Sequence, residues 1–258
     1  MLIDSHCHLD LLDLTKYNGD LHLALAVAAE QDVQHFLCPG VDLEHFPNIL
    51  KLAQENKNIF ASVALHPSEE VQYDLQEQEL LKLADNPLVV AIGETGLDYY
   101  YASNEEEHVM QRKRFVTHIR VARELHKSLI IHSRSAPEDI VNILRAEHAE
   151  DIGGVMHCFV DDWQTAQQVL AMGFYISFSG IITFKNAADL REVAIQVPLN
   201  KMLLETDAPY LAPVPYRGKP NEPAYLRNTA EFMANLRGIS YNELAEITTE
   251  NFFSLFVG

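Results

Sequence analysis

Eight short apolar runs, separated by segments of helical periodicity, constrain the fold of this chain more than any other feature of its sequence. The runs are rich in Val, Ile, Leu and Phe and lie at residues 1–9, 33–41, 59–67, 88–98, 128–134, 153–159, 174–180 and 201–209. Strands that alternate with helices pair in parallel through right-handed crossover connections. Because the chain has 258 residues, 48% of them apolar, it can bury one large core. We therefore predict an α/β fold, a (β/α)8 TIM-type barrel that forms a single domain over residues 1–258.

An open, doubly wound sheet is the alternative architecture for this alternation of elements. Such sheets usually begin with a glycine-rich turn that binds phosphate. The sequence contains neither the GxGxxG pattern nor a P-loop, and this favours the barrel.

Local patterns support the helical segments between the runs. Phe115, Ile119 and Ala122 have the spacing of one helix face. Pro137 is predicted to open a second helix, because proline is tolerated in the first turn. Ser240 with Glu243 has the capping-box pattern that precedes a helix.

The first run contains the pattern DSHCH at residues 4–8, in which two histidines are separated by one residue. On a strand, residues two apart point to the same face, so Asp4, His6 and His8 are predicted to share one face. The two imidazole rings can then converge on one ion. Cys7 and Cys158 each adjoin a candidate ligand and are predicted to point to the opposite face, so we expect neither thiol to bind metal.

Polar side chains recur at the carboxyl ends of the apolar runs, where barrel enzymes have their active sites. These residues are His6, His8, His66, Glu94, His132, His157 and Asp207. Burying so many titratable groups together is costly unless they are paired, and divalent cations would pair them. Histidines in helical or polar segments, and His35 inside a strand run, are assigned no chemistry.

The number of candidate ligands indicates two ions. One catalytic metal takes about three protein ligands and a water, whereas six strong candidates are present here. Glu94 is central in strand order and is the candidate to bridge the ions. Imidazole and carboxylate ligands without thiolate suit Zn, Mn or Mg. Two such ions can bind an ester oxygen, activate a water and stabilise the leaving oxygen.

The net charge of −18 argues against a protein that covers duplex nucleic acid with a broad basic face. It is compatible with an enzyme that holds a few phosphates at one site. Seven Lys or Arg residues and one acidic residue lie between Arg112 and Arg134. We interpret most of these cations as the solvated face of a helix.

Three cysteines suit a reducing compartment better than a disulfide framework. The most apolar early stretch is too short to span a bilayer, and the N-terminus lacks a signal-peptide pattern. We therefore expect a cytoplasmic protein that contacts no membrane and has no obligate protein partner.

The sequence resembles the TatD-like metal-dependent hydrolases, a branch of the amidohydrolase-like barrels that includes deoxyribonucleases. The resemblance covers nearly the whole chain through the motifs DSHCHLD, ALHP, AIGETGLDYY, IIHSR, MHCF, YISFSG, LLETDAPYLAP and YRGKPNEP. It implies the same six metal ligands as the strand ends do, with His6, His8 and Asp207 on one ion, His132 and His157 on the second, and Glu94 as the bridge.

The resemblance also implies roles in catalysis and substrate binding. Besides binding metal, Asp207 would accept the proton of the attacking water. Glu205 lies two residues before it and would orient a ligand or that water, although a structural ion pair is an equal alternative. The substrate phosphate would be contacted by His66, Arg134 and Arg217, because forked guanidinium groups suit phosphate oxygens.

Three stretches depart from the family pattern. Ser135 follows HSR where the family often has an acidic residue, HCFVDD replaces the more usual HCFSG, and residues 96–107 are rather acidic. An acidic rim repels long DNA unless Arg134, Arg217 and the ions offset it. These departures therefore concern the substrate and not the metal ligands.

We predict a divalent-metal-dependent hydrolase of ester bonds. The leading hypothesis is a deoxyribonuclease that acts as a 3′-5′ exonuclease on DNA, from single-stranded 3′ ends. The alternative is an enzyme that uses the same metal ligands to hydrolyse a small-molecule ester, amide or phosphoester. The acidic composition and the lack of an obvious aromatic stacking track favour this alternative. A third hypothesis is a metal-binding scaffold without turnover. Every predicted ligand position holds a residue that can bind metal, and this argues against the scaffold.

Overall fold

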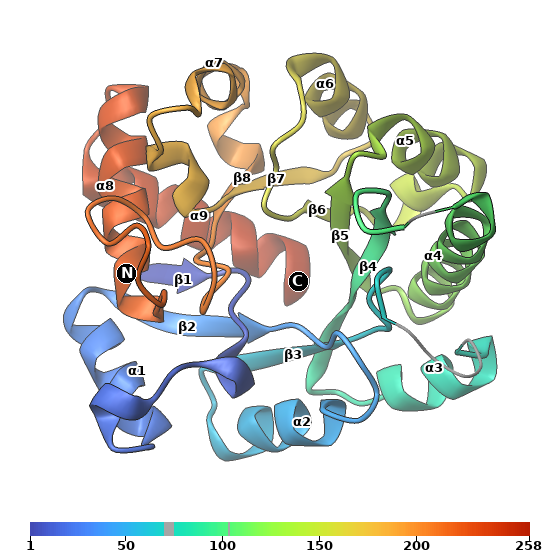
Figure 1. Ribbon diagram of the computed structural model, residues 1–258, viewed down its shortest axis with the longest axis horizontal. Helices are drawn as coiled ribbons and strands as arrows, with labels where there is room; N and C mark the ends of the chain where they lie inside the picture. Colours follow the sequence, from blue (N-terminus) through green and yellow to red (C-terminus); the bar gives the residue numbers. More distant parts are fainter. Residues whose placement is uncertain (70–74, 103) are drawn as a thin grey trace. The chain divides into compact units, whose positions relative to one another are not determined.

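The computed structural model describes residues 1–69, 75–102 and 104–258; Ser103, within the acidic stretch 96–107, lies outside the described residues. The strands form one eight-stranded sheet in the order β1 to β8 (Figure 1). They are β1 (Leu2–Asp4), β2 (Val33–Cys38), β3 (Ile59–Val63), β4 (Val89–Asp98), β5 (Ser128–Arg134), β6 (Gly154–Met156), β7 (Tyr175–Phe178) and β8 (Met202–Leu204). Each strand lies inside one predicted apolar run, and sequential order with intervening helices is the topology of a (β/α)8 barrel. The predicted fold class is confirmed.

The described helices fill the segments between the strands. They are α1 (Leu21–Glu30), α2 (Phe46–Glu55), α3 (Glu77–Ala84), α4 (Glu105–Leu125), α5 (Pro137–Ala146), α6 (Trp163–Ala171), α7 (Ala188–Gln196), α8 (Leu226–Arg237) and α9 (Tyr241–Phe256). The apolar stripe predicted in α4 is buried, and α5 begins at Pro137. The hydroxyl of Ser240 accepts the N–H of Glu243 at 3.1 Å, so the predicted cap of α9 is confirmed.

None of the helices in the described ranges combines the length and the apolar character needed to cross a membrane.

The described chain divides into two compact units. The first unit comprises Met1–Cys38, Cys158–Trp163 and Ile176–Gly258, and the second comprises Pro39–His157 and Gln164–Tyr175. The first therefore contains β1, β2 and β8 with most of β7, and the second contains β3 to β6. The single domain expected from the sequence stays a prediction.

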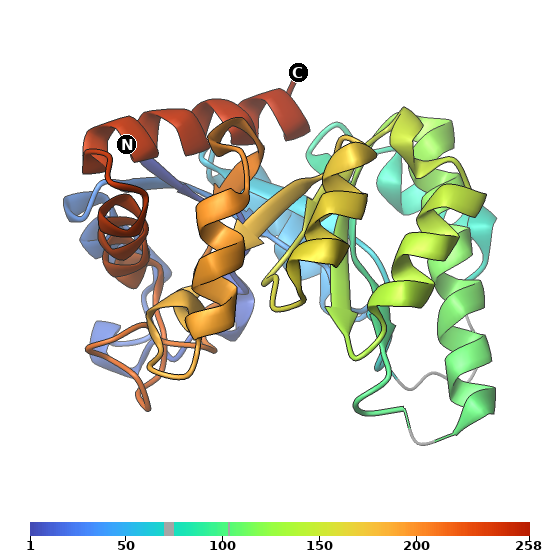
Figure 2. The ribbon, with the colours of Figure 1, turned by 90° about the horizontal axis from the view of Figure 1, so that it is seen from above.

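In the first unit, β1 lies beside β8, and α9 covers their amino-terminal ends. The N–H of Ser5 donates to the carbonyl of Leu204 at 3.1 Å. The amide of Asn251 in α9 donates to the carbonyl of Met202, the first residue of β8, at 2.8 Å. Figure 2 shows α9, in red, beside the N-terminus. The carboxyl ends of these strands are therefore the ends on which polar side chains can gather.

In the second unit, an irregularity in β4 sets the direction of a polar side chain. The register between β4 and β5 shifts between Ile92 and Thr95. A Cβ atom on Gly93 would lie 2.5 Å from the Cβ of Ile130, so only glycine lets the two strands approach so closely. Bulges of this kind redirect side chains next to functional sites, and the residue that follows Gly93 is Glu94.

Candidate functional site

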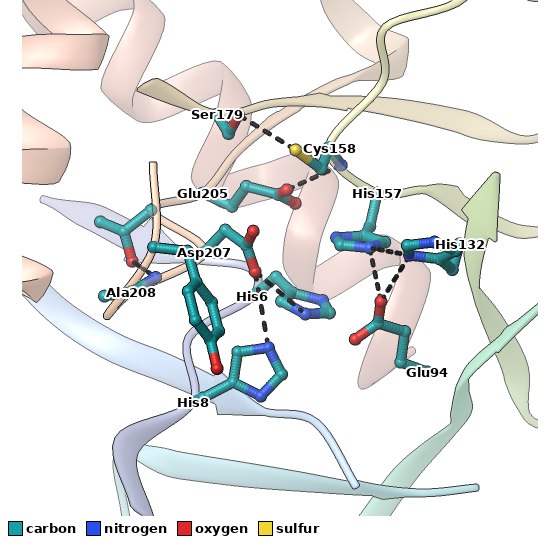
Figure 3. A network of polar contacts seen from close by, with 12 residues as sticks. His6, His8, Glu94, His132, His157, Cys158, Ser179, Glu205, Asp207 and Ala208 are labelled. Atoms are coloured by element: carbon teal, nitrogen blue, oxygen red, sulfur yellow. Dashed lines mark hydrogen bonds and ion pairs between the residues drawn. The ribbon is translucent and has the colours of Figure 1, made fainter. Parts of the chain in front are cut away.

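The first unit brings together His6, His8 and Asp207 (Figure 3). One carboxylate oxygen of Asp207 lies 3.8 Å from Nε2 of His6 and 3.5 Å from Nε2 of His8. Both histidines are buried, whereas the Asp207 side chain is 13% exposed. Ligand atoms around a tetrahedral zinc lie about 3.3–3.6 Å apart. The distance to His8 lies in this range and the distance to His6 slightly exceeds it, so the donor atoms are of the type and near the spacing that a divalent cation needs.

The histidines of this group lie beyond β1, which ends at Asp4. The prediction that Asp4, His6 and His8 share one strand face is therefore wrong. The carboxylate of Asp4 instead accepts the N–H and the hydroxyl of Thr206, at 2.9 and 2.6 Å. Burial raises the pKa of Asp4 to about 7, although these hydrogen bonds oppose the shift.

Main-chain hydrogen bonds, rather than strand alternation, hold the two histidines near Asp207. The N–H of Asp207 donates to the carbonyl of His6, and the N–H of His8 donates to the carbonyl of Ala208, both at 2.9 Å. The segment after β1 is thereby tied to the segment after β8. The imidazole rings meet edge to face with centroids 5.1 Å apart.

The second unit brings together Glu94, His66, His132 and His157. One oxygen of Glu94 lies 2.9 Å from Nδ1 of His132, 2.8 Å from Nε2 of His157 and 3.3 Å from Nε2 of His66. Figure 3 shows His132 and His157 directed toward this carboxylate. Three imidazole groups thus surround one buried carboxylate oxygen. His66, expected at the substrate phosphate, also offers a nitrogen to this group; its phosphate role stays a prediction.

The electrostatics of this second group suit a cation. Burial lowers the pKa of His66 despite the nearby Glu94, and the neutral imidazole is the form that binds metal. Burial also acts to lower the pKa of His132, but hydrogen bonds to Asp98 and Glu94 outweigh it, so the pKa is raised. A bound cation would replace the proton that these carboxylates attract to His132.

Sequence reasoning missed Asp98, the last residue of β4. Its Oδ2 lies 3.1 Å from Nε2 of His132, the nitrogen that does not face Glu94. Burial acts to raise the pKa of Asp98, but the hydrogen bond and charge of His132, the N–H of Tyr101 and the charge of Arg134 together lower the pKa. A carboxylate on the second nitrogen orients a metal-binding histidine. Asp98 and Glu94 lie on the same strand at an even spacing, which is typical of side chains on one face, and this signal could have identified Asp98.

Three further residues from the sequence prediction occupy different environments. Glu205 is buried, and its Oε1 accepts the N–H of Cys158 at 2.7 Å (Figure 3). Arg217 is exposed, with its guanidinium 4.3 Å from the ring centroid of Phe184. Arg134, the last residue of β5, lies over the ring of Tyr100. Their roles in substrate binding stay predictions.

The basic stretch from Arg112 to Arg134 is less uniformly solvated than expected. Arg114 is buried, and its guanidinium donates to the carbonyls of His66 and Pro67 at 2.6 and 3.2 Å. Lys127 donates to three carbonyls around the start of β4, those of Ala84, Asn86 and Val89. These cations satisfy main-chain oxygens, which the charge pattern alone did not reveal.

A profile of the family described as "TatD related DNase" matches residues 3–257 of the chain. The protein named "Uncharacterized metal-dependent hydrolase YcfH" from Escherichia coli K12 is 48% identical, over 99% of this chain and 95% of that protein. The protein named "3'-5' ssDNA/RNA exonuclease TatD" from Shigella flexneri is 32% identical, over 95% of this chain and 96% of that protein.

Among solved structures, YjjV, a TatD homologue from Escherichia coli K12, matches with a TM-score of 0.90 and 28% identity, covering 100% of this chain and 98% of that one. A hydrolase of the TatD family from Entamoeba histolytica matches with a TM-score of 0.84 and 21% identity, covering 99% and 97% of the two chains. The motifs of the sequence predict a likeness to YjjV in particular, and the structural match agrees with this prediction. The chain nevertheless shares a larger fraction of identical residues with YcfH than with YjjV.

Proposed function

The chain belongs to the TatD family of metal-dependent hydrolases, as its motifs predict, and we propose that it hydrolyses DNA from single-stranded 3′ ends. Family membership assigns metal-dependent hydrolysis, and the choice of substrate is the proposal. The observation that carries the proposal is the pair of ligand groups, each with imidazole nitrogens and a carboxylate, on a family background that includes a named exonuclease.

We propose that each ligand group holds one divalent ion, Zn, Mn or Mg. The first ion would be held by His6, His8 and Asp207, and the second by Glu94, His132 and His157, with His66 adjacent. When bound, such ions polarise a phosphate oxygen and acidify a water molecule. The bridging role expected of Glu94 stays a prediction.

The residues of the chain would then position the substrate and move one proton. The carboxylate of Asp207, which is partly open to solvent, accepts a proton as water attacks phosphorus. A new P–O bond forms, the bond to the 3′ oxygen of the preceding nucleotide breaks, and a 5′-nucleotide is released. Arg134 and Arg217 contact the non-bridging phosphate oxygens. Glu205, whose carboxylate accepts the N–H of Cys158, orients a ligand or the attacking water.

A single-strand degradation assay tests this proposal. Purified protein is mixed with Mg, Mn or Zn and a single-stranded DNA labelled at its 5′ end, with a phosphomonoester as parallel substrate. We expect progressive shortening from the 3′ end, loss of activity with a chelator, and at least a 100-fold lower rate for His132→Ala, about the order of losing one electrostatic contact in an active site. Intact DNA with every ion, while the phosphomonoester turns over, would reject the proposal.

A small-molecule ester, amide or phosphoester is the second candidate substrate, and the acidic composition favours it. Glu105, Glu106 and Glu107 form the first turn of α4, shortly after β4, and the net charge is −18. This charge opposes the approach of long polyanions. A panel of small esters, amides and phosphoesters distinguishes the candidates, because a small-molecule hydrolase would turn over one of them and leave DNA intact.

A further inference from the structure

The turn after β4 presents two exposed tyrosines next to Arg134. Tyr100 and Tyr101 are 62% and 64% exposed, and their rings meet edge to face with centroids 5.0 Å apart. The guanidinium carbon of Arg134 lies 4.1 Å from the Tyr100 centroid and 4.9 Å from the Tyr101 centroid. Two neighbouring aromatic side chains beside an arginine form the kind of surface on which planar, anionic ligands stack.

One carboxylate fixes this turn relative to the second ligand group. Oδ1 of Asp98 accepts the N–H groups of Tyr100 and Tyr101, each at 3.1 Å. Its other oxygen faces Nε2 of His132 at 3.1 Å. Arg134 follows His132 by two residues on β5 and pairs with Asp98 across the β4–β5 register. The main chain of the two tyrosines is therefore tied to the His132 side chain through a single carboxylate.

Tyr99 has a packing role that its two neighbours lack. Its ring stacks on His108 with centroids 3.9 Å apart, and its hydroxyl donates to Asp139 at 2.6 Å. The only ring contacts of Tyr100 and Tyr101 within the described parts of the chain are with each other and with Arg134. Packing therefore accounts for Tyr99 and leaves the exposure of Tyr100 and Tyr101 unexplained.

We propose that Tyr100, Tyr101 and Arg134 form a stacking site for the base of a nucleotide next to the scissile phosphate. The inference rests on the proposed function. Every nucleobase has a π-face, so tyrosine rings bind bases with little sequence preference. A guanidinium that stacks through its face keeps its N–H groups directed outward along its edges, where a phosphate oxygen can accept them.

The charges near this site favour the end of a nucleic-acid strand over its interior. The first turn of α4 follows the tyrosines closely in the chain and carries Glu106 and Glu107 besides Glu105, which pairs with Arg112, and this charge opposes a continuing polyanion. Two rings accommodate about one or two bases. The site therefore suits a terminal nucleotide better than the interior of a long strand.

Abasic substrates test the inference. The wild type is given a single-stranded oligonucleotide with an intact 3′ end and the same oligonucleotide whose last two nucleotides are abasic. We expect the KM for the abasic strand to be about 5- to 100-fold higher, the range of one stacking contact. In Tyr100→Ala with Tyr101→Ala, the KM for the intact strand rises and the ratio of the two KM values falls toward 1.

Two control variants separate stacking from general damage. Tyr241 in α9 also lies beside an arginine, with the guanidinium of Arg227 3.7 Å from its ring, but its hydroxyl donates to Asp32 and it lies outside both ligand groups, so Tyr241→Leu leaves the KM ratio unchanged. Tyr100→Phe with Tyr101→Phe retains both rings and keeps the discrimination. Thermal unfolding of each variant shows that it is folded, and fluorescence anisotropy of a labelled hexathymidine in chelator measures binding without turnover.

The outcomes distinguish this inference from the proposed function. If the wild type degrades single strands but the alanine variant keeps the wild-type KM ratio and hexathymidine affinity, the stacking site is wrong and the proposed function stands. If the wild type leaves single strands intact while a small phosphoester turns over, the proposed function fails, and the inference fails with it.

Discussion

At the residue scale, Asp98 connects a predicted metal ligand to the turn that carries the exposed tyrosines. Its carboxylate contacts His132 on one side and two main-chain N–H groups on the other. A neutral amide in its place would hold the imidazole less firmly and would remove a negative charge from beside the cation. Substituting Asp98 alone therefore measures what this carboxylate contributes to metal binding, with every predicted metal ligand kept.

Asp98→Asn should weaken binding of one ion about 10- to 100-fold, the usual effect of losing a carboxylate behind a metal-binding histidine. Competition with a chromogenic chelator measures the affinity. Asp151→Asn is the matched control, because Asp151 is exposed and pairs with Arg123 on the surface. Equal affinity of wild type and Asp98→Asn would show that Asp98 plays no part in metal binding.

The cysteines give a second prediction at this scale. Burial raises the pKa of the Cys7 and Cys38 thiols well above the ordinary value. Because the thiolate is the reactive form, a raised pKa leaves almost none of it at pH 8. A thiol reagent at pH 8 should therefore modify neither residue in the native protein and both in guanidinium chloride. Rapid native labelling of Cys38, mapped by mass spectrometry, would contradict the burial described here.

At the scale of elements, the stability of helix α9 depends on the hydrogen bond that caps its amino-terminal end and on its contact with β8. Ser240 caps the helix, and Asn251 ties it to the start of β8. Ser240→Ala should lower the free energy of unfolding by about 1 kcal/mol, because an N-terminal N–H of the helix loses its partner. Urea denaturation measures the change.

Ser254→Ala is the matched control for this prediction, since Ser254 is exposed within α9. Alanine favours the helix interior, so this substitution should leave stability unchanged or slightly higher. Equal effects of the two substitutions would mean that the cap contributes nothing.

The apolar runs and helix patterns predicted where the elements lie, but not where each strand ends. β1 ends at Asp4 because main-chain groups of His6 and His8 bond to the segment after β8, some 200 residues away in the chain. Periodicity within one run cannot reveal such a partner. The burial of Arg114 in α4 could not be predicted for the same reason, since its guanidinium donates to carbonyls of the loop after β3.

At the scale of the whole molecule, the alternation of strands and helices was enough to predict the barrel, and strand-end polarity was enough to select the ligand candidates. The structure gathers these candidates into one group in each compact unit. Asp98 was not predicted although its even spacing from Glu94 was a usable signal, and the exposed tyrosines were not predicted because the exposure of an aromatic ring cannot be read from residue type. Asp98 and Tyr100 lie in the motif AIGETGLDYY, which carries part of the resemblance to the family, and Tyr101 follows it directly.

Native mass spectrometry of the metal-stripped protein, reconstituted with zinc, tests most directly whether two groups of imidazole and carboxylate side chains hold two cations. We predict two ions on the wild type and one on each of two double variants, His6→Ala with His8→Ala and His132→Ala with His157→Ala. A wild-type protein that takes up no zinc, or double variants that still bind two ions, would contradict this prediction.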